Sequence, residues 1–266
     1  MPGRVLIIAG SDSGGGAGIQ ADIKTVTALG GYAMTAVTAV TVQNTLGVTG
    51  VHEIPPAVIA AQIEAVLGDL GADVIKTGML ASAGIIAVVK ETLERLAPGI
   101  PRIIDPVMQA TAGGQPLLAA SAVEDLRGLI KGARLLTPNL PEAGILTGRT
   151  IRTVADMESA VPALRDLGAQ AVLLKGGHVE GDTVVDLLIA EGEVRRFTDS
   201  RIATSSTHGT GCTLASAVAA GLADGMDLTP AVIRARTYVR QAILTAPRLG
   251  RGKGPLNHTH TVKKFQ

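Results

Sequence analysis

Residues 207–217 read THGTGCTLASA and hold the single cysteine of the chain, Cys212, directly after Gly209, Thr210 and Gly211. The two glycines free the backbone to turn sharply, and the small residues that follow favour a helix that begins near Gly211. The unpaired N–H groups of a helix start and the positive end of its dipole form a site for anions. We therefore predict that this segment holds a transferring phosphoryl group. We also expect the helix start to lower the pKa of Cys212, which would then take the proton of an attacking hydroxyl.

Three other interpretations of this segment stay open. The pattern is also typical of an ordinary glycine-containing loop before an alanine-rich helix. A lone cysteine is often a small buried apolar residue. With His208 only four residues away, Cys212 would also suit the nucleophile of a cysteine hydrolase. The hydrolase is disfavoured because the Asp, Asn, Glu and Lys residues expected at other strand ends would then have no role.

A second glycine-rich stretch, GAGIQA at residues 16–21, matches the dinucleotide-binding fingerprint in its Ala-ended form. That fingerprint requires an acidic residue about 20 positions further on to hold a ribose. No Asp or Glu occurs between Asp22 and Glu53, and the glycines lie too far past Ala9 for the tight turn. Nicotinamide binding is therefore disfavoured. Residues 14–18 are interpreted as a loop that covers a substrate, with a plain flexible loop as the alternative.

Short apolar runs alternate with helical patterns, which predicts the sheet that must position these residues. Near-continuous apolar runs, typical of parallel strands buried on both faces, occupy residues 5–9, 34–42, 74–79, 102–107, 134–137 and 171–175. Apolar residues at three- and four-residue spacing predict helices over 56–70, 83–96, 154–167, 211–224 and 230–246. Residues 183–190 and 193–198 predict an antiparallel hairpin. The pattern predicts an α/β fold with a mainly parallel, doubly wound sheet, in one domain over residues 1–266.

Polar and glycine residues follow each of the six predicted parallel strands. They occupy residues 10–22, 43–45, 77–79, 105–108, 137–143 and 175–178. Ligands of such sheets bind at the carboxyl ends of the strands. Six strand ends with polar side chains therefore favour one binding site over six unrelated loops.

Composition limits the class of protein. Hydrophobic residues make up 46% of the 266 residues, charged residues 18%, and the formal net charge is +1. This balance argues against nucleic acid or an anionic membrane as a partner. No stretch approaches the roughly 18 to 20 apolar residues that span a bilayer, and the apolar run near the N-terminus is too short for a signal peptide. One cysteine excludes an intrachain disulfide and a multi-cysteine metal site, so we expect a cytoplasmic protein.

Seven motifs, taken together and in order, resemble one known family. They are AGSDSGGGAGIQADIKT (9–25), VTVQNT (40–45), KTGML (76–80), DPVM (105–108), LTPNLPEA (136–143), LLKGGH (173–178) and THGTGCTLASA (207–217). The chain strongly resembles the hydroxymethylpyrimidine/phosphomethylpyrimidine kinases of thiamine biosynthesis, in the ribokinase-like superfamily, from about Arg4 to residues 253–258. The resemblance implies a ribokinase-like three-layer αβα fold with a mainly parallel central sheet and a small β-hairpin.

The same resemblance implies two ATP-dependent phosphorylations in one site. The first converts 4-amino-5-hydroxymethyl-2-methylpyrimidine to its monophosphate, and the second converts the monophosphate to the pyrophosphate. It assigns Cys212 to catalysis and Gly209, Thr210 and Gly211 to the anion hole. It assigns Gln43 to reading the pyrimidine, because an amide offers an acceptor and two donors to an amino group beside a ring nitrogen.

The remaining implied contacts fall into three groups. The substrate contacts are Gly10, Asp22, Met79 and Val107; the ATP contacts are Lys175, Asn139 and Thr210; and the residues that organise Mg²⁺ and its waters are Glu142, Asn139 and Asp105. Carboxylate and amide oxygens suit this hard cation. Structural alternatives stay open: NLPE is also a helix start capped by Asn139 with Glu142 at its third position, and Asp22 is also an ordinary first-turn acid.

Two departures from the family pattern concern the second transfer and the substrate. Thr77 replaces an apolar residue, and residues 109–118 lack a basic residue near position 111. The missing charge bears on the relative rates of the two phosphorylations. Pyridoxal kinase activity is the nearest alternative, followed by other small-molecule kinases and a non-catalytic vitamin-binding module. Related enzymes are commonly dimers, so we expect a homodimer.

Overall fold

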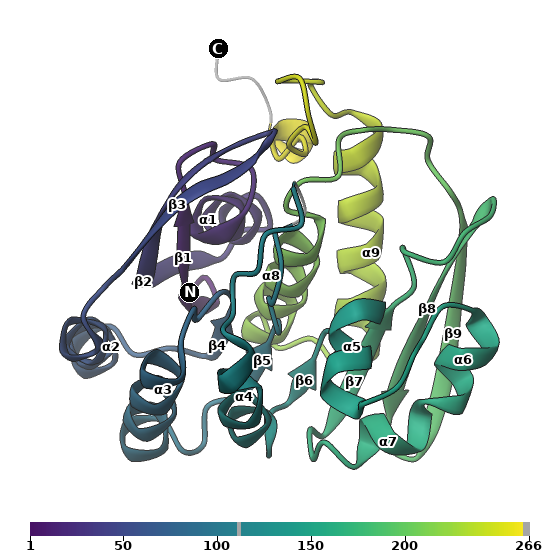
Figure 1. Ribbon diagram of the computed structural model, residues 1–266. Coiled ribbons are helices and arrows are strands. Elements are labelled where there is room, and N and C mark those ends of the chain that lie inside the picture. The colour runs from purple at the N-terminus through teal and green to yellow at the C-terminus, as the bar shows by residue number, and fades with distance from the viewer. Residues whose placement is uncertain (111–112, 263–266) are drawn as a thin grey trace.

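In the computed structural model, which describes residues 1–110 and 113–262, nine strands form one continuous sheet. The strands are β1 (Arg4–Asp12), β2 (Tyr32–Asn44), β3 (Gly47–Glu53), β4 (Val74–Thr77), β5 (Arg102–Ile104), β6 (Leu135–Leu136), β7 (Ala171–Lys175), β8 (Thr183–Ala190) and β9 (Glu193–Ser200). Their order in the sheet is β3-β2-β1-β4-β5-β6-β7-β8-β9. Six neighbouring strands in the middle of this order, β2, β1, β4, β5, β6 and β7, are parallel. Strand β3 at one edge and strands β8 and β9 at the other pair in antiparallel fashion (Figure 1).

Helices cover both faces of this sheet. They are α1 (Gly18–Ala28), α2 (Pro56–Asp69), α3 (Ala83–Leu96), α4 (Val123–Ile130), α5 (Leu140–Thr147), α6 (Val154–Ser159), α7 (Val161–Arg165), α8 (Thr210–Ala223) and α9 (Leu228–Leu244). Successive side chains of a strand point to opposite faces, so both faces of β1 are apolar. Leu6 and Ile8 pack in the cluster under α2 to α7, while Val5 and Ile7 pack in the cluster under α1, α8 and α9. The result is the expected αβα sandwich.

The sequence predictions for the central strands and for the hairpin of β8 and β9 are confirmed. The single helix expected over residues 154–167 is wrong, because the chain forms two short helices, α6 and α7, that meet at Ala160. Pro162 lies in the first turn of α7, and a proline has no N–H with which to continue the hydrogen bonds of α6. The short strands β5 and β6 also end earlier than the apolar runs suggest.

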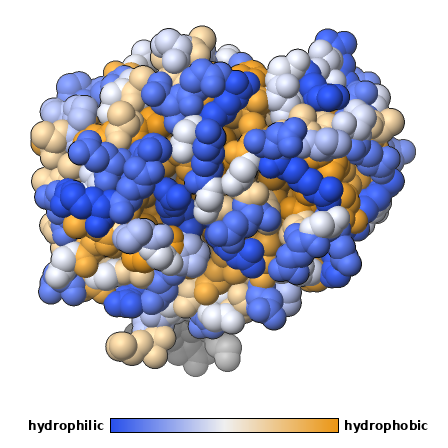
Figure 2. Space-filling view, turned by 90° about the horizontal axis from the view of Figure 1, so that it is seen from below, coloured by the Kyte–Doolittle hydropathy of each residue, from blue (hydrophilic) through white to orange (hydrophobic). Residues whose placement is uncertain are grey.

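Strand β3 was absent from the sequence predictions. It pairs with β2 in an antiparallel hairpin and lies at the exposed edge of the sheet. Most of its residues are exposed, so it has no apolar run or clear alternation by which it could be recognised. No helix in the described residues is long and apolar enough to cross a membrane, and Figure 2 shows polar and apolar residues interspersed on the face seen from below.

Candidate active site

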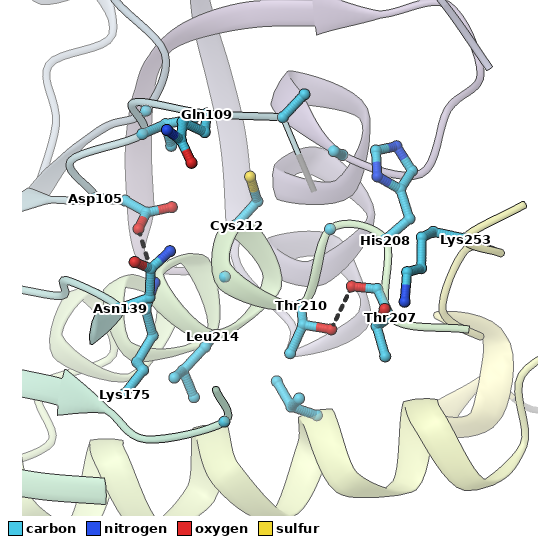
Figure 3. A pocket seen from close by; sticks show the side chains of 18 of the residues that line it. Asp105, Gln109, Asn139, Lys175, Thr207, His208, Thr210, Cys212, Leu214 and Lys253 are labelled. Carbon is cyan, nitrogen blue, oxygen red and sulfur yellow. Dashed lines mark hydrogen bonds and ion pairs between the residues drawn. The ribbon is translucent and has the colours of Figure 1, made fainter. Parts of the chain in front are cut away.

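A cavity of about 860 Å³ lies at the carboxyl ends of the parallel strands and the start of α8. Most of the residues predicted for the site line it, among them Gly10, Gln43, Met79, Asp105, Val107, Asn139, Glu142, Lys175, Gly209, Thr210, Gly211 and Cys212. Figure 3 shows two groups of side chains on either side of Cys212. Asp105, Asn139 and Lys175 lie on one side, and His208 and Lys253 lie on the other.

The start of α8 has the geometry expected of an anion site. Gly209 is the N-cap with φ 80°, and a Cβ atom at this position would collide with the carbonyl oxygen of Gly16. Only glycine therefore fits where the two loops touch. The Oγ1 of Thr210 donates to the carbonyl of Thr207 at 2.8 Å. In the described part of the chain, the N–H groups of Gly211 and Cys212 have no acceptor and remain available to a ligand.

The thiol of Cys212 does not have the lowered pKa that the sequence suggested. Although Cys212 is only half-buried, burial is the largest cause that raises its pKa, to about 12. The nearby carboxylates of Asp22 and Asp105 raise it further, while Lys76 and the backbone N–H of Gly18 oppose them. The prediction of a stabilised thiolate is therefore wrong, because two anions and desolvation outweigh the helix start.

On one side of Cys212, charged groups dominate. The Nζ of Lys175 lies 3.1 Å from Oδ1 of Asp105, which also accepts a hydrogen bond of 3.1 Å from Thr137. A Cβ atom on Gly211 would lie 3.1 Å from this Nζ, so the ammonium reaches the start of α8. Burial is the main cause that raises the pKa of Glu142 to about 7, against the charge of Lys175.

The helix-capping interpretation of Asn139 and Glu142 is confirmed. The backbone N–H of Glu142 donates to Oδ1 of Asn139 at 2.9 Å, and the backbone N–H of Asn139 donates to Oε2 of Glu142 at 2.8 Å. The described residues contain no cluster of three or more His, Cys, Asp or Glu that would enclose a metal ion. Two pocket carboxylates beside the open start of α8 nevertheless fit Mg²⁺, which keeps several waters and binds through one or two carboxylates and the phosphates of its ligand.

On the other side of Cys212, a network of hydrogen bonds joins Asp12, His208 and Gln43. Nε2 of His208 lies 2.8 Å from Oδ2 of Asp12 and 3.3 Å from Nε2 of Gln43. Asp12 also accepts the backbone N–H groups of Gly14, Gly16 and Ala17 at 2.8 to 3.0 Å. Three amides of the glycine-rich loop are therefore occupied by a carboxylate of the protein and are not free to bind a ligand.

The cysteine hydrolase interpretation is contradicted. Within the described residues, no hydrogen bond joins His208 to Cys212: Nε2 of the ring is engaged by Asp12, and Nδ1 has no partner. A cysteine nucleophile needs its base within hydrogen-bond reach.

Asp22 is the one predicted site residue that does not line the cavity. Both of its oxygens accept from Nζ of Lys76, at 2.8 and 2.9 Å, and Ser216 donates to it at 2.7 Å. Asp22 and Lys76 are fully buried, so Asp22 holds Lys76 in place and is not positioned as a substrate contact. The expectation of a direct contact with the substrate hydroxymethyl group is wrong for this reason. Position 111 lies outside the described residues, so the missing basic residue there has no structural outcome.

The pocket residues that sequence reasoning missed include Asp12, Lys76, His208 and Lys253. Asp12 and Lys76 lie at the ends of β1 and β4, so their strand-end positions were the signal available. His208 was considered only as a partner of Cys212. Lys253 lies in a loop beyond α9, and backbone hydrogen bonds of this loop, such as the one of 2.8 Å from Lys253 to Thr45, hold it at the cavity.

An αβα sandwich with an open helix start, a lysine and carboxylates at the strand ends defines a small-molecule kinase of the ribokinase-like fold. The family model described as phosphomethylpyrimidine kinase matches residues 12–257, and the chain belongs to this family. A hydroxymethylpyrimidine/phosphomethylpyrimidine kinase of Mycobacterium tuberculosis is 50% identical over 258 residues, covering 96% of this chain and 94% of that protein. The thiamine biosynthesis bifunctional protein ThiED of Geobacter sulfurreducens is 49% identical over 257 residues, which are 96% of this chain but only 52% of that protein.

Solved structures include relatives with two different names. A pyridoxal kinase of Staphylococcus aureus in complex with AMP-PCP and pyridoxal has a TM-score of 0.88 and 35% identity, covering 97% of this chain and 94% of that one. A phosphomethylpyrimidine kinase of Clostridium difficile has a TM-score of 0.79 and 41% identity, covering 90% of this chain and 99% of that one. The fold is therefore shared by both kinds of vitamin kinase, and the choice of substrate rests on the pocket.

Proposed function

We propose that this protein transfers the γ-phosphoryl group of ATP to 4-amino-5-hydroxymethyl-2-methylpyrimidine and then to its monophosphate, for thiamine biosynthesis. Relatives about 50% identical over nearly the whole chain are named hydroxymethylpyrimidine/phosphomethylpyrimidine kinases. One observation on the structure supports the proposal most directly: a single cavity joins the amide of Gln43, the open start of α8 and the ion pair of Lys175 with Asp105. The cavity thus has a side chain that can recognise the pyrimidine ring beside groups that can bind phosphates.

The charged side of the cavity suits the ATP phosphates. The N–H groups of Gly211 and Cys212 would receive the transferring phosphoryl group, and Lys175 would neutralise its charge. The hydroxyl of Thr210 would join them by turning away from the carbonyl of Thr207. Asp105, Glu142 and Asn139 would hold Mg²⁺ and its waters, and the metal would supply charge neutralisation at the phosphates. Asn139 would thereby serve both the nucleotide and the cap of α5.

The transfer itself requires a hydroxyl oxygen placed in line with the phosphoryl group. That oxygen forms the new bond to the γ-phosphorus while the bond from phosphorus to the departing ADP oxygen breaks. Cys212 would take the hydroxyl proton on its sulfur. Because its pKa is about 12, the acceptor is the small thiolate fraction, which increases tenfold with each unit of pH.

The second transfer brings two phosphate groups together, and Lys253 is placed to offset their repulsion. The other cations that line the cavity each have a protein partner, namely Lys76, Lys175, Arg201, Arg236 and Arg240. Among the described residues, the ammonium of Lys253 has none, and Figure 3 shows it beside Thr207 and His208. We assign it to the phosphate of the monophosphate substrate.

The test is to incubate the protein with Mg·ATP and, in separate reactions, the hydroxymethylpyrimidine, its monophosphate and pyridoxal, and to follow ADP release. Turnover on both pyrimidines is expected. Activity on pyridoxal with none on either pyrimidine would overturn the proposal. It would instead favour the pyridoxal kinase alternative, for which the structural similarity to the Staphylococcus aureus enzyme argues.

A further inference from the structure

Gln43 can recognise a pyrimidine only if its amide oxygen faces a donor of the ring and its amide nitrogen faces an acceptor. The two ends of an amide have the same shape and differ only in hydrogen bonding. Its backbone is fixed first. The N–H of Gln43 donates to Oγ of Ser13, and Oγ of Ser13 lies 2.9 Å from the carbonyl oxygen of Gln43. The side chain then reaches two neighbours, His208 on one side and Thr41 on the other.

The protonation of His208 follows from its contact with Asp12. Burial would raise the pKa of Asp12, but hydrogen bonds from His208 and from the N–H of Ala17 outweigh it and hold this pKa below its ordinary value. Asp12 is therefore an ionised carboxylate that only accepts hydrogen bonds. His208 is buried, and its Nε2, 2.8 Å from Oδ2 of Asp12, must carry a hydrogen. Its Nδ1 is buried without a partner among the described residues, which suits a bare lone pair better than an N–H.

This assignment decides which end of the Gln43 amide faces His208. As the structure stands, Nε2 of Gln43 faces Nε2 of His208 at 3.3 Å and Oε1 faces Oγ1 of Thr41 at 3.1 Å, which leaves two N–H groups facing each other. Because the two ends of an amide have the same shape, we assign them in the exchanged order. On the other side, Oγ1 of Thr41 lies 3.1 Å from the amide and 3.0 Å from the carbonyl of Ser11. In the exchanged order the single hydrogen of this hydroxyl goes to the carbonyl of Ser11, and Thr41 accepts from the amide nitrogen. With the amide oxygen facing His208 and its nitrogen facing Thr41, no two donors face each other, and one amide N–H remains for a ligand.

We infer that His208 is a positioning residue that sets the order in which Gln43 presents its acceptor and its donor to the substrate. The inference rests on the proposed function, in which Gln43 contacts the pyrimidine. The amide oxygen on the His208 side accepts from the 4-amino group, and the remaining N–H on the Thr41 side donates to the adjacent ring nitrogen. Pyridoxal has no amino group beside a ring nitrogen, so the fixed order also discriminates against it.

The same contact couples the substrate reader to the phosphate site. His208 precedes Gly209, the N-cap of α8, and its backbone N–H donates to the carbonyl of Gly254 at 3.0 Å. Asp12, its side-chain partner, also gathers the N–H groups of the glycine-rich loop. One histidine therefore fixes the ring reader relative to the point where the phosphoryl group arrives.

The test is a double-mutant cycle on pyrimidine binding, measured by calorimetry and as KM. His208→Leu should weaken pyrimidine binding by roughly 10- to 100-fold, the range for an unpaired buried donor or acceptor, and this loss should exceed the change in kcat and in the KM for ATP. In the Gln43→Ala background the same change should cost less than about threefold, because its effect passes through Gln43. His208→Gln keeps an N–H where Nε2 lies and should restore most of the affinity.

Two results would overturn this inference and leave the proposed function standing. One is a double mutant whose loss of pyrimidine affinity equals the product of the losses in the two single mutants. The other is a His208→Gln variant that binds the pyrimidine no better than His208→Leu. If the His208→Leu protein does not fold, the cycle is built with His208→Gln instead. Its pyrimidine affinity is then compared with that of wild type, both with Gln43 present and in the Gln43→Ala background. Wild-type protein that neither binds nor phosphorylates the pyrimidine would overturn the proposed function and this inference together.

Discussion

The two sides of the cavity differ in the kind of interaction they offer a ligand. The side with Lys175, Asp105 and Glu142 concentrates buried charge, and one of its carboxyl groups has a pKa raised to about 7. The side with Gln43 and His208 instead joins an amide and an imidazole to the carboxylate of Asp12 through side-chain contacts of 2.8 and 3.3 Å. Charged groups can bind the phosphates of ATP whatever the phosphoryl acceptor is. Hydrogen-bond donors and acceptors in a fixed order, by contrast, recognise one particular ring. From this difference we propose that phosphoryl transfer and substrate choice use separate residues on either side of α8.

Gly209→Ala should give the largest effect, because Gly209 lies where the two sides meet. The new Cβ would collide with Gly16, and φ 80° is strained for alanine. We expect kcat/KM to fall by about 100-fold or more for both pyrimidines, since small displacements of a reacting group cost about this much. Gly225→Ala is the matched control: φ is 83° there, and the space around the new Cβ is open. It should lower stability by about 1 kcal/mol and leave activity near wild type. Equal activity in the two variants would contradict the contact between the loops.

Cys212→Ala should lower kcat by roughly 100-fold at pH 8, the smaller end of what a general base contributes. The raised pKa makes the pH profile more informative than the rate. In wild type, kcat/KM for the pyrimidine should rise about tenfold per pH unit from 7 to 9, because the thiolate fraction grows up to a pKa of about 12. The profile of the variant should be flat. A flat wild-type profile would show that the thiol is not the base.

Glu142→Gln should separate the stability of the charged side from its activity. The folded pKa of about 7 lies above the value of a free glutamate, so the wild type loses stability as pH rises from about 4.5 to 7. Gln retains the capping acceptor for Asn139 but carries no charge. Above pH 7 the variant should be more stable by about 1 to 3 kcal/mol in denaturant unfolding and yet turn over ATP more slowly. The exposed Glu91→Gln is the control, and a destabilised Glu142→Gln protein at pH 8 would refute the account.

Lys253→Ala should have the smallest effect, because the ammonium lies at the exposed rim. We expect the KM for the monophosphate to rise by roughly tenfold, while the KM for the unphosphorylated pyrimidine stays within about twofold. Arg251→Ala removes a charge from the same loop but not from the cavity lining, and should change neither value. If the KM for ATP rises equally in both reactions, Lys253 contacts the nucleotide instead.

Sequence patterns predicted the layers of the fold and most of the cavity lining because both depend on local signals. Apolar runs mark buried strands, and polar strand ends mark the cavity. The pairing of Asp12 with His208 joins residues 196 positions apart, and that of Ser216 with Asp22 joins residues 194 apart. Such contacts have no local pattern, so the burial of Asp22 and the orientation of Gln43 required the packed structure.

The pKa of Cys212 shows the same limit. A helix start is visible in the sequence and lowers the pKa of a thiol, but the anions that oppose it, Asp22 and Asp105, come from α1 and from the segment after β5. Their positions depend on how α8 packs against α1 and the sheet. The direction of the shift is therefore a property of tertiary structure, and no motif around Cys212 reports it.

The most direct test of separate transfer and recognition sides is to measure by calorimetry the Kd for Mg·ADP and for the hydroxymethylpyrimidine in two variants. Lys175→Met should weaken nucleotide binding by roughly 10-fold or more and leave pyrimidine binding within about threefold of wild type. Gln43→Ala should do the reverse, weakening pyrimidine binding by roughly 10- to 100-fold with little change for the nucleotide. Two variants that each weaken both ligands by similar factors would contradict the division of the cavity at α8.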